Sequence, residues 1–217
     1  MLRQIPPYLY LILLGFFTLL MLQITLKYIP FSPDAAFLMI KQTEVNELPF
    51  YLPVFYTHVY TAMFVLPAGL TQFSNYFLKH YKKAHRAIGY MYVVTVLLFA
   101  GPSGLVMGIF ANGGIVAQVF FVVLAMLWWW FTFKALQAAK QGKYAEHKAY
   151  MIRSFALTLS AVTLRLWKLI LVKAFHPNPM DVYVVVSGLG WVPNLLIAEL
   201  VIINKNFRLF TQPKPIR

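Results

Sequence analysis

Long apolar blocks separated by short charged segments make up most of this chain. Six such blocks are present, and they cover residues 8–26, 50–78, 87–110, 115–139, 149–172 and 182–203. A helix needs about 20 apolar residues to cross the hydrocarbon layer of a membrane. We therefore expect an all-α fold, a polytopic membrane helix bundle in which a single integral membrane domain over residues 1–217 forms six transmembrane helices.

Residues that break helices interrupt three of the expected spans. Pro67 lies within the second block, Gly101 and Pro102 lie within the third, and Gly190 and Pro193 lie within the sixth. Proline lacks a backbone N–H, and its ring collides with the carbonyl four residues earlier in a helix. The sequence therefore predicts bends in these three spans.

The distribution of positive charge predicts the orientation of the spans. If both chain ends lie in the cytoplasm, 13 positive residues lie inside, including those of the tail 204–217, and three lie outside. The inside residues are Arg3, Lys79, Lys82, Lys83, Arg86, Lys134, Lys140, Lys143, Lys148, Lys205, Arg208, Lys214 and Arg217, and the outside residues are Lys27, Lys41 and Lys173. Cytoplasmic loops of membrane proteins carry an excess of Lys and Arg. The sequence therefore predicts an N-in, C-in protein with a basic cytoplasmic tail.

Composition narrows the partners and the chemistry. Hydrophobic residues make up 60% of the chain and charged residues 12%, against about 25% charged residues in soluble domains. The net charge of +13 flanks apolar blocks, so it fits anionic lipid headgroups and not nucleic acid. Cysteine is absent, which excludes disulfides, thiol catalysis and thiolate ligation.

Two charged residues lie at matching depth in the fifth and sixth spans. Arg153 and Glu199 each lie about four residues from the inner end of their span, or roughly 6 Å at 1.5 Å per residue. Charges within a membrane are costly and usually pair. We expect a salt bridge, and two roles stay open for it: a structural lock between helices, or a proton or substrate site.

Polar residues also occur in the outer halves of the spans. Arg165 on the fifth span either extends to the outer headgroups or faces the bundle near His58 on the second span and Gln118 on the fourth. The second arrangement would form an outer polar pocket.

Two histidines are candidates for haem ligation. His85 opens the third span and His147 precedes the fifth, both at the inner surface. A b-type haem takes axial imidazoles from facing helices, so His85 and His147 could bind one haem iron. Both lie in basic loops, where histidine is also an ordinary loop residue. His58 is a further cofactor candidate, but the fourth span has no histidine to pair with it.

A quinone would need a neutral donor beside an apolar slot. The inner ends of the spans offer Gln72, Asn75, Tyr92 and Arg153. These residues are compatible with quinone binding without being diagnostic of it.

Three sequence motifs carry a resemblance to a known family. They are HRAIGYMYV at residues 85–93, GPSGLVMG at 101–108 and EHKAYMIRSFALTLSAVTLRL at 146–166. Over roughly residues 55–200 the chain resembles a bacterial family of predicted multi-pass membrane proteins of unknown function. That resemblance implies a bacterial inner (cytoplasmic) membrane protein and brings no established activity.

The histidine and glycine at the start of the third span also resemble those of diheme transmembrane cytochromes b, which use ascorbate or reduce ferric iron. Those cytochromes place paired histidines at two depths. This chain supplies only the layer of His85 and His147, so it departs from that pattern.

Three functions therefore stay open. The first is electron transfer that is linked to a b-type haem or a quinone, and the second is transport of a small molecule. The third is a non-catalytic subunit of a larger membrane complex. The sequence leaves open whether the protein is an enzyme.

Overall fold

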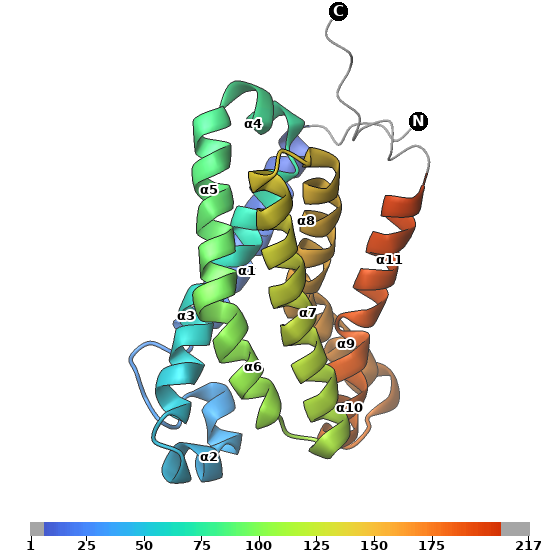
Figure 1. The fold of residues 1–217 in the computed structure, drawn as a ribbon. Helices are drawn as coiled ribbons and strands as arrows, with labels where there is room; N and C mark the ends of the chain where they lie inside the picture. The colour runs from blue at the N-terminus through green and yellow to red at the C-terminus, as the bar shows by residue number, and fades with distance from the viewer. Residues whose placement is uncertain (1–6, 205–217) are drawn as a thin grey trace, which may run out of the picture. The chain divides into compact units, whose positions relative to one another are not determined.

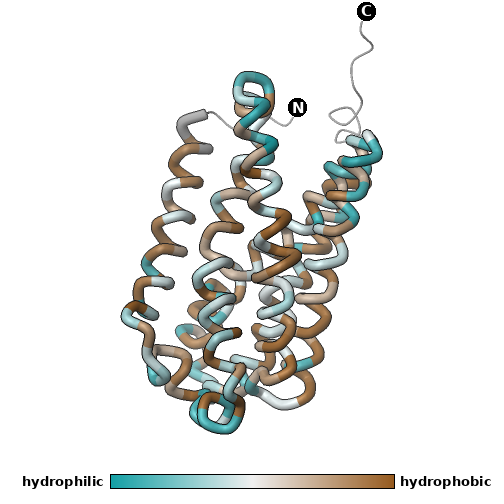
Figure 2. Tube along the Cα trace, turned by 60° about the vertical axis from the view of Figure 1, so that its left-hand side comes forward, coloured by the Kyte–Doolittle hydropathy of each residue, from teal (hydrophilic) through white to brown (hydrophobic). Residues whose placement is uncertain are grey.

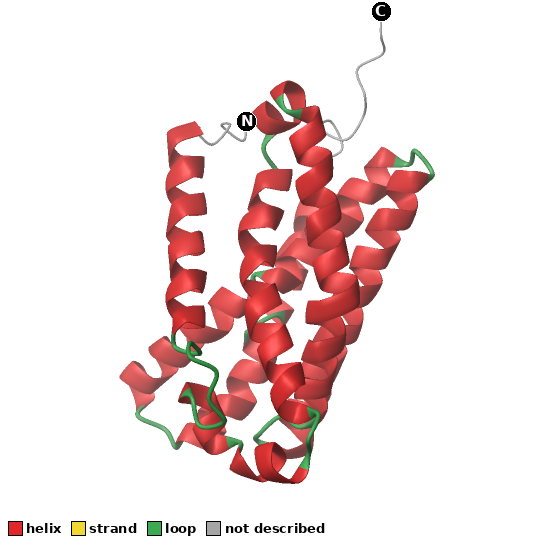
Figure 3. Cartoon of the chain, turned by 90° about the vertical axis from the view of Figure 1, so that its left-hand side faces the viewer, coloured by secondary structure: helices red, strands yellow, loops and turns green. Residues whose placement is uncertain are grey.

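The computed structural model describes residues 7–204, all of whose regular structure is helical (Figures 1 and 3). Arg3 and the basic tail from Lys205 to Arg217 lie outside the described residues. The chain divides into two compact units between Thr95 and Val96, and each unit is described by itself. Hydrophilic stretches gather at helix ends and connections, whereas the helix interiors are largely apolar (Figure 2).

The N-terminal unit is built on three long helices that pack in sequence. Helix α1 (Pro7–Leu26) packs against α3 (Tyr51–Gln72), which packs against α5 (Lys82–Val94). Along the chain, two short helices, η1 (Ala36–Ile40) and α2 (Gln42–Glu47), come between α1 and α3, and α4 (Asn75–His80) comes between α3 and α5. The Ser74 hydroxyl caps α4 by accepting from the Phe77 N–H at 3.2 Å.

Two tyrosines of α3 hold the segment that connects α1 to α3. The Tyr56 hydroxyl accepts from the Ser32 N–H at 2.9 Å and donates to the Ser32 carbonyl at 2.8 Å. The Tyr60 hydroxyl donates to the Tyr28 carbonyl at 2.7 Å. The connection is therefore an ordered part of the unit, because its backbone groups are bonded to side chains of α3.

A π-helical segment, η2 (Thr95–Ala100), joins α5 to α6 (Gly101–Ile109). Pro102 cannot donate to a carbonyl of the preceding turn, and Trp129 Nε1 donates to the Leu97 carbonyl at 3.1 Å. A β-carbon at Gly101 would lie 2.5 Å from the Val96 carbonyl oxygen. The bend predicted at Gly101 and Pro102 therefore takes the form of a π-helical turn that requires glycine.

The C-terminal unit contains α6, α7 (Gly114–Lys140), α8 (Tyr144–Thr158), α9 (Ser160–Phe175), α10 (Pro179–Leu189) and α11 (Val192–Ile203). Helix α7 packs against α6, α8 and α10. Small residues permit this packing, since a β-carbon at Gly108 would lie 3.1 Å from the backbone of α7. Gly113 makes the α6–α7 turn at φ +87°, a backbone conformation that favours glycine.

The last two apolar blocks each form two helices. Leu159 separates α8 from α9, and Gly190 and Trp191 separate α10 from α11. Helix α9 packs against α10, and α8 packs against α11 (Figure 1). The interruption predicted at Gly190 and Pro193 is confirmed, whereas the one at Leu159 was not predicted.

Within residues 7–204, four helical stretches are long and apolar enough to cross a membrane. They are Lys82–Ile109, Gly114–Lys140, Tyr144–Phe175 and Pro179–Ile203, and a shorter apolar stretch covers Leu11–Leu26. The all-α fold is confirmed, and the chain has the helices of a membrane bundle.

Candidate functional site

Arg153 on α8 and Glu199 on α11 form a bidentate ion pair. Arg153 Nε lies 2.5 Å from Glu199 Oε1, and a second guanidinium nitrogen lies 2.8 Å from Glu199 Oε2. The guanidinium also lies over the rings of Phe131 and Tyr150, 5.8 and 5.5 Å from their centroids. The structure thus brings together the two charges that the sequence pairs, and the planar fork of Arg matches the carboxylate.

The ion pair is only partly shielded. The side chains of Arg153 and Glu199 keep 21% and 35% of their accessible surface. The pair links α8 to α11, and part of each side chain remains at the surface of the chain. Both roles considered for the pair, a structural lock and a proton or substrate site, stay predictions.

A second polar cluster joins the two helix interruptions, and we call it the Asn194 node. Asn194 Nδ2 contacts the Thr163 hydroxyl at 2.9 Å and the carbonyl oxygens of Ala156 and Gly190, each at 3.2 Å. The Thr163 hydroxyl also bonds to the Gly190 carbonyl. The node comprises Asn194, Thr163, Ala156 and Gly190. The side chains of Asn194 and Thr163 supply hydrogen bonds to the carbonyls of Ala156 and Gly190, which lie next to the interruptions.

Sequence reasoning missed the Asn194 node. Asn194 follows Pro193 inside an apolar block. A polar side chain next to a helix-breaking residue was the available signal, because such a side chain can bond to a displaced carbonyl.

His147 on α8 is bonded to α7. Its Nδ1 lies 2.8 Å from the Ala135 carbonyl oxygen. A carbonyl oxygen only accepts, so Nδ1 carries the proton and Nε2 is the basic nitrogen. This bond fixes both the tautomer and the orientation of the imidazole.

Further polar contacts continue along the same pair of helices. The hydroxyls of Thr132 and Ser154 lie 2.7 Å apart, and Trp128 Nε1 donates to the Thr158 hydroxyl at 3.1 Å. All four side chains are buried. The α7–α8 ladder, which we define as His147–Ala135, Thr132–Ser154 and Trp128–Thr158, holds the two helices together by hydrogen bonds.

His85 lies near the start of α5 and is half-buried. It belongs to the N-terminal unit, whereas His147 belongs to the C-terminal unit, so each is described within its own unit. No cluster of three or more His, Cys, Asp or Glu residues suited to a metal occurs among residues 7–204. Ligation of iron by His85 and His147 stays a prediction.

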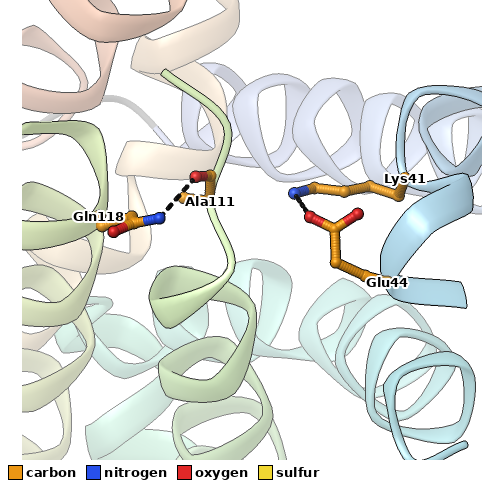
Figure 4. Close-up of polar contacts among 4 residues, drawn as sticks. All are labelled: Lys41, Glu44, Ala111 and Gln118. Carbon is orange, nitrogen blue, oxygen red and sulfur yellow. Dashed lines mark hydrogen bonds and ion pairs between the residues drawn. The ribbon is translucent and has the colours of Figure 1, made fainter. Parts of the chain in front are cut away.

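The residues of the expected outer pocket have separate environments. Gln118 Nε2 donates to the Ala111 carbonyl at 3.4 Å (Figure 4). Arg165 is exposed on α9 and donates to the Ala161 carbonyl of its own helix. His58 is half-buried on α3, in the N-terminal unit. The outer pocket stays a prediction.

Lys41, which the charge count places outside, is nearly inaccessible in the structure. Its side chain is 1% exposed and its Nζ lies 2.5 Å from Glu44 Oε1 (Figure 4). A lysine is rarely buried unless it is paired. The spacing of Lys41 and Glu44, three residues apart, was the signal for this pair.

The residues considered for a quinone also have defined contacts. Gln72 Nε2 donates to the Thr71 hydroxyl at 3.1 Å, and Tyr92 is fully buried on α5. Arg153 is engaged by Glu199. These contacts leave quinone binding as a prediction.

Comparison with known proteins identifies the family of the chain. No curated protein and no solved structure matches it. A family described as "Predicted membrane protein (DUF2306)" matches residues 55–202, which confirms the family resemblance predicted over roughly residues 55–200. The likeness to diheme cytochromes b stays a prediction. The chain belongs to the DUF2306 family of predicted membrane proteins, whose function is unknown.

Proposed function

We propose that this membrane protein is an electron carrier of the bacterial inner membrane that binds a b-type haem through His147. Haem would supply a reversible one-electron change of the iron. The proposal includes six spans with both ends in the cytoplasm, His85 as the second axial ligand and a membrane quinone as the redox partner. These elements rest on sequence reasoning.

The observation that carries the proposal is the bond between His147 Nδ1 and the Ala135 carbonyl. Histidines that ligate metals usually donate their other ring N–H to a carbonyl or a carboxylate. In this arrangement Nε2 is the ring nitrogen that would coordinate the haem iron. The donor set of His147 therefore fits an axial ligand.

The competing role for the same bond is structural. His147 is also part of the α7–α8 ladder, in which every other contact joins helices without any cofactor. Under that role the histidine would hold α8 to α7, and its loss would lower stability without changing any absorbance.

An absorbance spectrum separates the two roles. Protein purified from haem-sufficient cells should show a Soret band and a reduced-minus-oxidised difference spectrum. Both should be lost in His147→Ala and in His85→Ala, and both should persist in His80→Ala. His80 is the matched control, because its Nδ1 also contacts a carbonyl, that of Tyr76, at 2.9 Å, and it lies on an exposed part of α4.

Two outcomes would overturn the haem proposal. The first is a folded, colourless protein that binds no added haemin. The second is a Soret band of full intensity in His147→Ala. Equal expression and equal thermal stability of the variants show that any loss of the band is a loss of ligation.

Transport is the second candidate, and the two interrupted helices favour it. Transporter sites are commonly built from broken membrane helices, and here the interruptions lie next to each other at the Asn194 node. The Arg153–Glu199 pair lies on the same helices and is partly exposed. Proton movement is the simplest flux that such a pair supports.

A liposome assay with an enclosed pH-sensitive dye tests the transport candidate. The parent protein should increase proton permeability, and Glu199→Gln should abolish the increase while Arg165→Leu leaves it unchanged. Equal permeability of protein-free and protein-containing liposomes would contradict the transport function.

A further inference from the structure

The helices on either side of the two interruptions form two separate pairs. Helices α9 and α10 pack against each other and are joined by residues 176–178, and we call them the α9–α10 hairpin. Helices α8 and α11 also pack against each other, and the Arg153–Glu199 ion pair links them. We call this second pair the α8–α11 stem (Figure 1).

Two chain connections join the hairpin to the stem, at Leu159 and at Gly190–Trp191. Near Leu159 the chain continues through a tight turn, in which the Leu159 carbonyl accepts from the N–H groups of Val162 and Thr163 at 2.9 and 3.0 Å. Between α10 and α11, Trp191 has φ −137° and ψ −29°, outside the helical range. Pro193 cannot donate to the preceding turn. The α10–α11 connection therefore leaves the helical conformation at Trp191, whereas at Leu159 (φ −62°, ψ −15°) the helical turn is only tightened.

The Asn194 node is the link between hairpin and stem at these two points. Asn194 lies on the stem, and its Nδ2 contacts Thr163 of the hairpin and the carbonyl of Gly190 that ends it. Its third contact is the Ala156 carbonyl of the stem. One carboxamide thus holds the ends of all four helices.

The same position contains an unsatisfied polar group. The Trp191 side chain is 7% exposed, and within residues 7–204 its buried Nε1 has no hydrogen-bond partner. An unpaired buried donor costs about 1–3 kcal/mol. An unpaired buried group of this kind calls for an explanation, such as stored strain, a functional role or a bound water.

Aromatic side chains of α7 contact the hairpin. Phe121 and Tyr183 lie 5.7 Å apart between ring centroids, and the Phe120 ring would lie 3.1 Å from a β-carbon at Gly188. Tyr183 also bonds to the backbone of Asn112. The hairpin thus packs against α7 through ring contacts and one hydrogen bond to the α6–α7 turn.

We infer that the α9–α10 hairpin is a movable element that pivots at Leu159 and at Gly190–Trp191, with the Asn194 node as its latch. At about 1.5 Å per residue, Gly190 lies roughly 16 Å along the helix from Pro179, near the middle of a hydrocarbon layer about 30 Å thick. The pivot therefore lies about half a membrane thickness from the loop that joins α9 to α10, so a movement of the hairpin would change the packing in one half of the membrane only. This inference is independent of haem binding.

Spin-label distances measure the movement directly, and the absence of native cysteine makes the labelling specific. The hairpin pair combines Val119→Cys on α7 with Val185→Cys on α10. The stem pair combines Tyr144→Cys on α8 with Ile203→Cys on α11. All four native side chains are exposed, so labels at these sites do not disturb packing.

The latch is opened by Asn194→Ala, with Leu196→Ala as its matched control. Leu196 lies two residues further along α11, and its side chain is exposed. In lipid nanodiscs, Asn194→Ala should add a second, longer component to the hairpin-pair distances and leave the stem-pair distances unchanged. Leu196→Ala should change neither pair.

Two results would overturn the inference. Hairpin-pair distances that are identical in Asn194→Ala and in the parent would show that no latch exists. A change in both pairs would show that the whole unit loosens, and not that one hairpin pivots. If Asn194→Ala does not fold, Thr163→Val removes the hydroxyl partner at nearly constant volume and is judged by the same two criteria.

Discussion

Single hydrogen-bonding groups contribute to the stability of the C-terminal unit. Two buried tryptophans show the contrast. Trp128 Nε1 donates to Thr158, whereas Trp191 Nε1 is buried without a partner within residues 7–204. Both rings contribute apolar contact, so the two residues differ mainly in the fate of the N–H.

Replacing each of these tryptophans by phenylalanine should therefore give different results. Trp128→Phe should lower the free energy of unfolding by about 1–3 kcal/mol, because Thr158 loses its donor and the ring shrinks. Trp191→Phe should cost less than about 1 kcal/mol, since removal of an unpaired N–H offsets the smaller ring. Unfolding in mixed micelles measures both values. A larger loss for Trp191→Phe than for Trp128→Phe would contradict this assignment.

A charged residue that loses its partner also lowers stability. Arg153→Leu leaves Glu199 partly buried without its partner, and we expect a loss of about 1–3 kcal/mol, below the value for fully buried pairs because both side chains are partly exposed. The double variant Arg153→Leu/Glu199→Leu should recover most of that loss. Unfolding of the four proteins of this mutant cycle gives the coupling. Additive losses in the double variant would mean that the ion pair contributes no coupling.

Part of the site was predictable from single residues. The pairing of Arg153 with Glu199 follows from depth, because two opposite charges in apolar spans lower each other's cost. The partners of His147, Thr132 and Asn194 did not follow from depth. They depend on helix register and on backbone carbonyls, neither of which a pattern of polar residues specifies.

At the scale of elements, the π-helical turn determines how α6 begins. Its features agree: Pro102 lacks an N–H, Trp129 donates to the Leu97 carbonyl, and Gly101 leaves room for the Val96 carbonyl. The sequence predicted a bend here from Gly101 and Pro102. It did not predict a π-helical form, because that depends on the carbonyl positions of the preceding turn.

Gly101→Ala should therefore be destabilising where an ordinary glycine is not. The added methyl would lie 2.5 Å from the Val96 oxygen and 3.3 Å from the Trp129 ring, so the backbone must shift. We expect a cost of about 1–3 kcal/mol, as for other overpacked sites. Gly15→Ala is the control, because no atom lies within 4 Å of its added β-carbon. Thermal unfolding in detergent compares the two, and equal transition temperatures would refute the requirement for glycine.

The apolar blocks predicted which segments are helical better than where each helix ends. The expected second span, 50–78, corresponds to α3 and to most of α4, separated near Ser74. The expected fifth span, 149–172, lies within α8 and α9, whose helical stretch begins earlier, at Tyr144. Hydropathy averages over many residues and is insensitive to a cap or to a single displaced turn.

At the scale of the molecule, the charge distribution makes the orientation testable. Alkaline phosphatase is active outside the cytoplasm and green fluorescent protein is fluorescent inside it. Fusions after Lys83 and after Lys143 should give fluorescence, and fusions after Lys41 and after Asn178 should give phosphatase activity. All four sites lie in connections between the expected spans. If fusions at two consecutive sites reported the same side of the membrane, the six-span arrangement would be excluded.

The contact between Tyr56 and Ser32 has a consequence for mutational tolerance. One phenol satisfies both the N–H and the carbonyl of residue 32, so it recognises the main chain and not the identity of the side chain there. In a saturation library, position 32 should accept more amino acids than position 56, although substitutions of Ser32 also lose the bond of the Ser32 hydroxyl to Asp34 Oδ1 at 2.7 Å. The tolerance of position 32 would then depend on Tyr56, which lies 24 residues further along the chain.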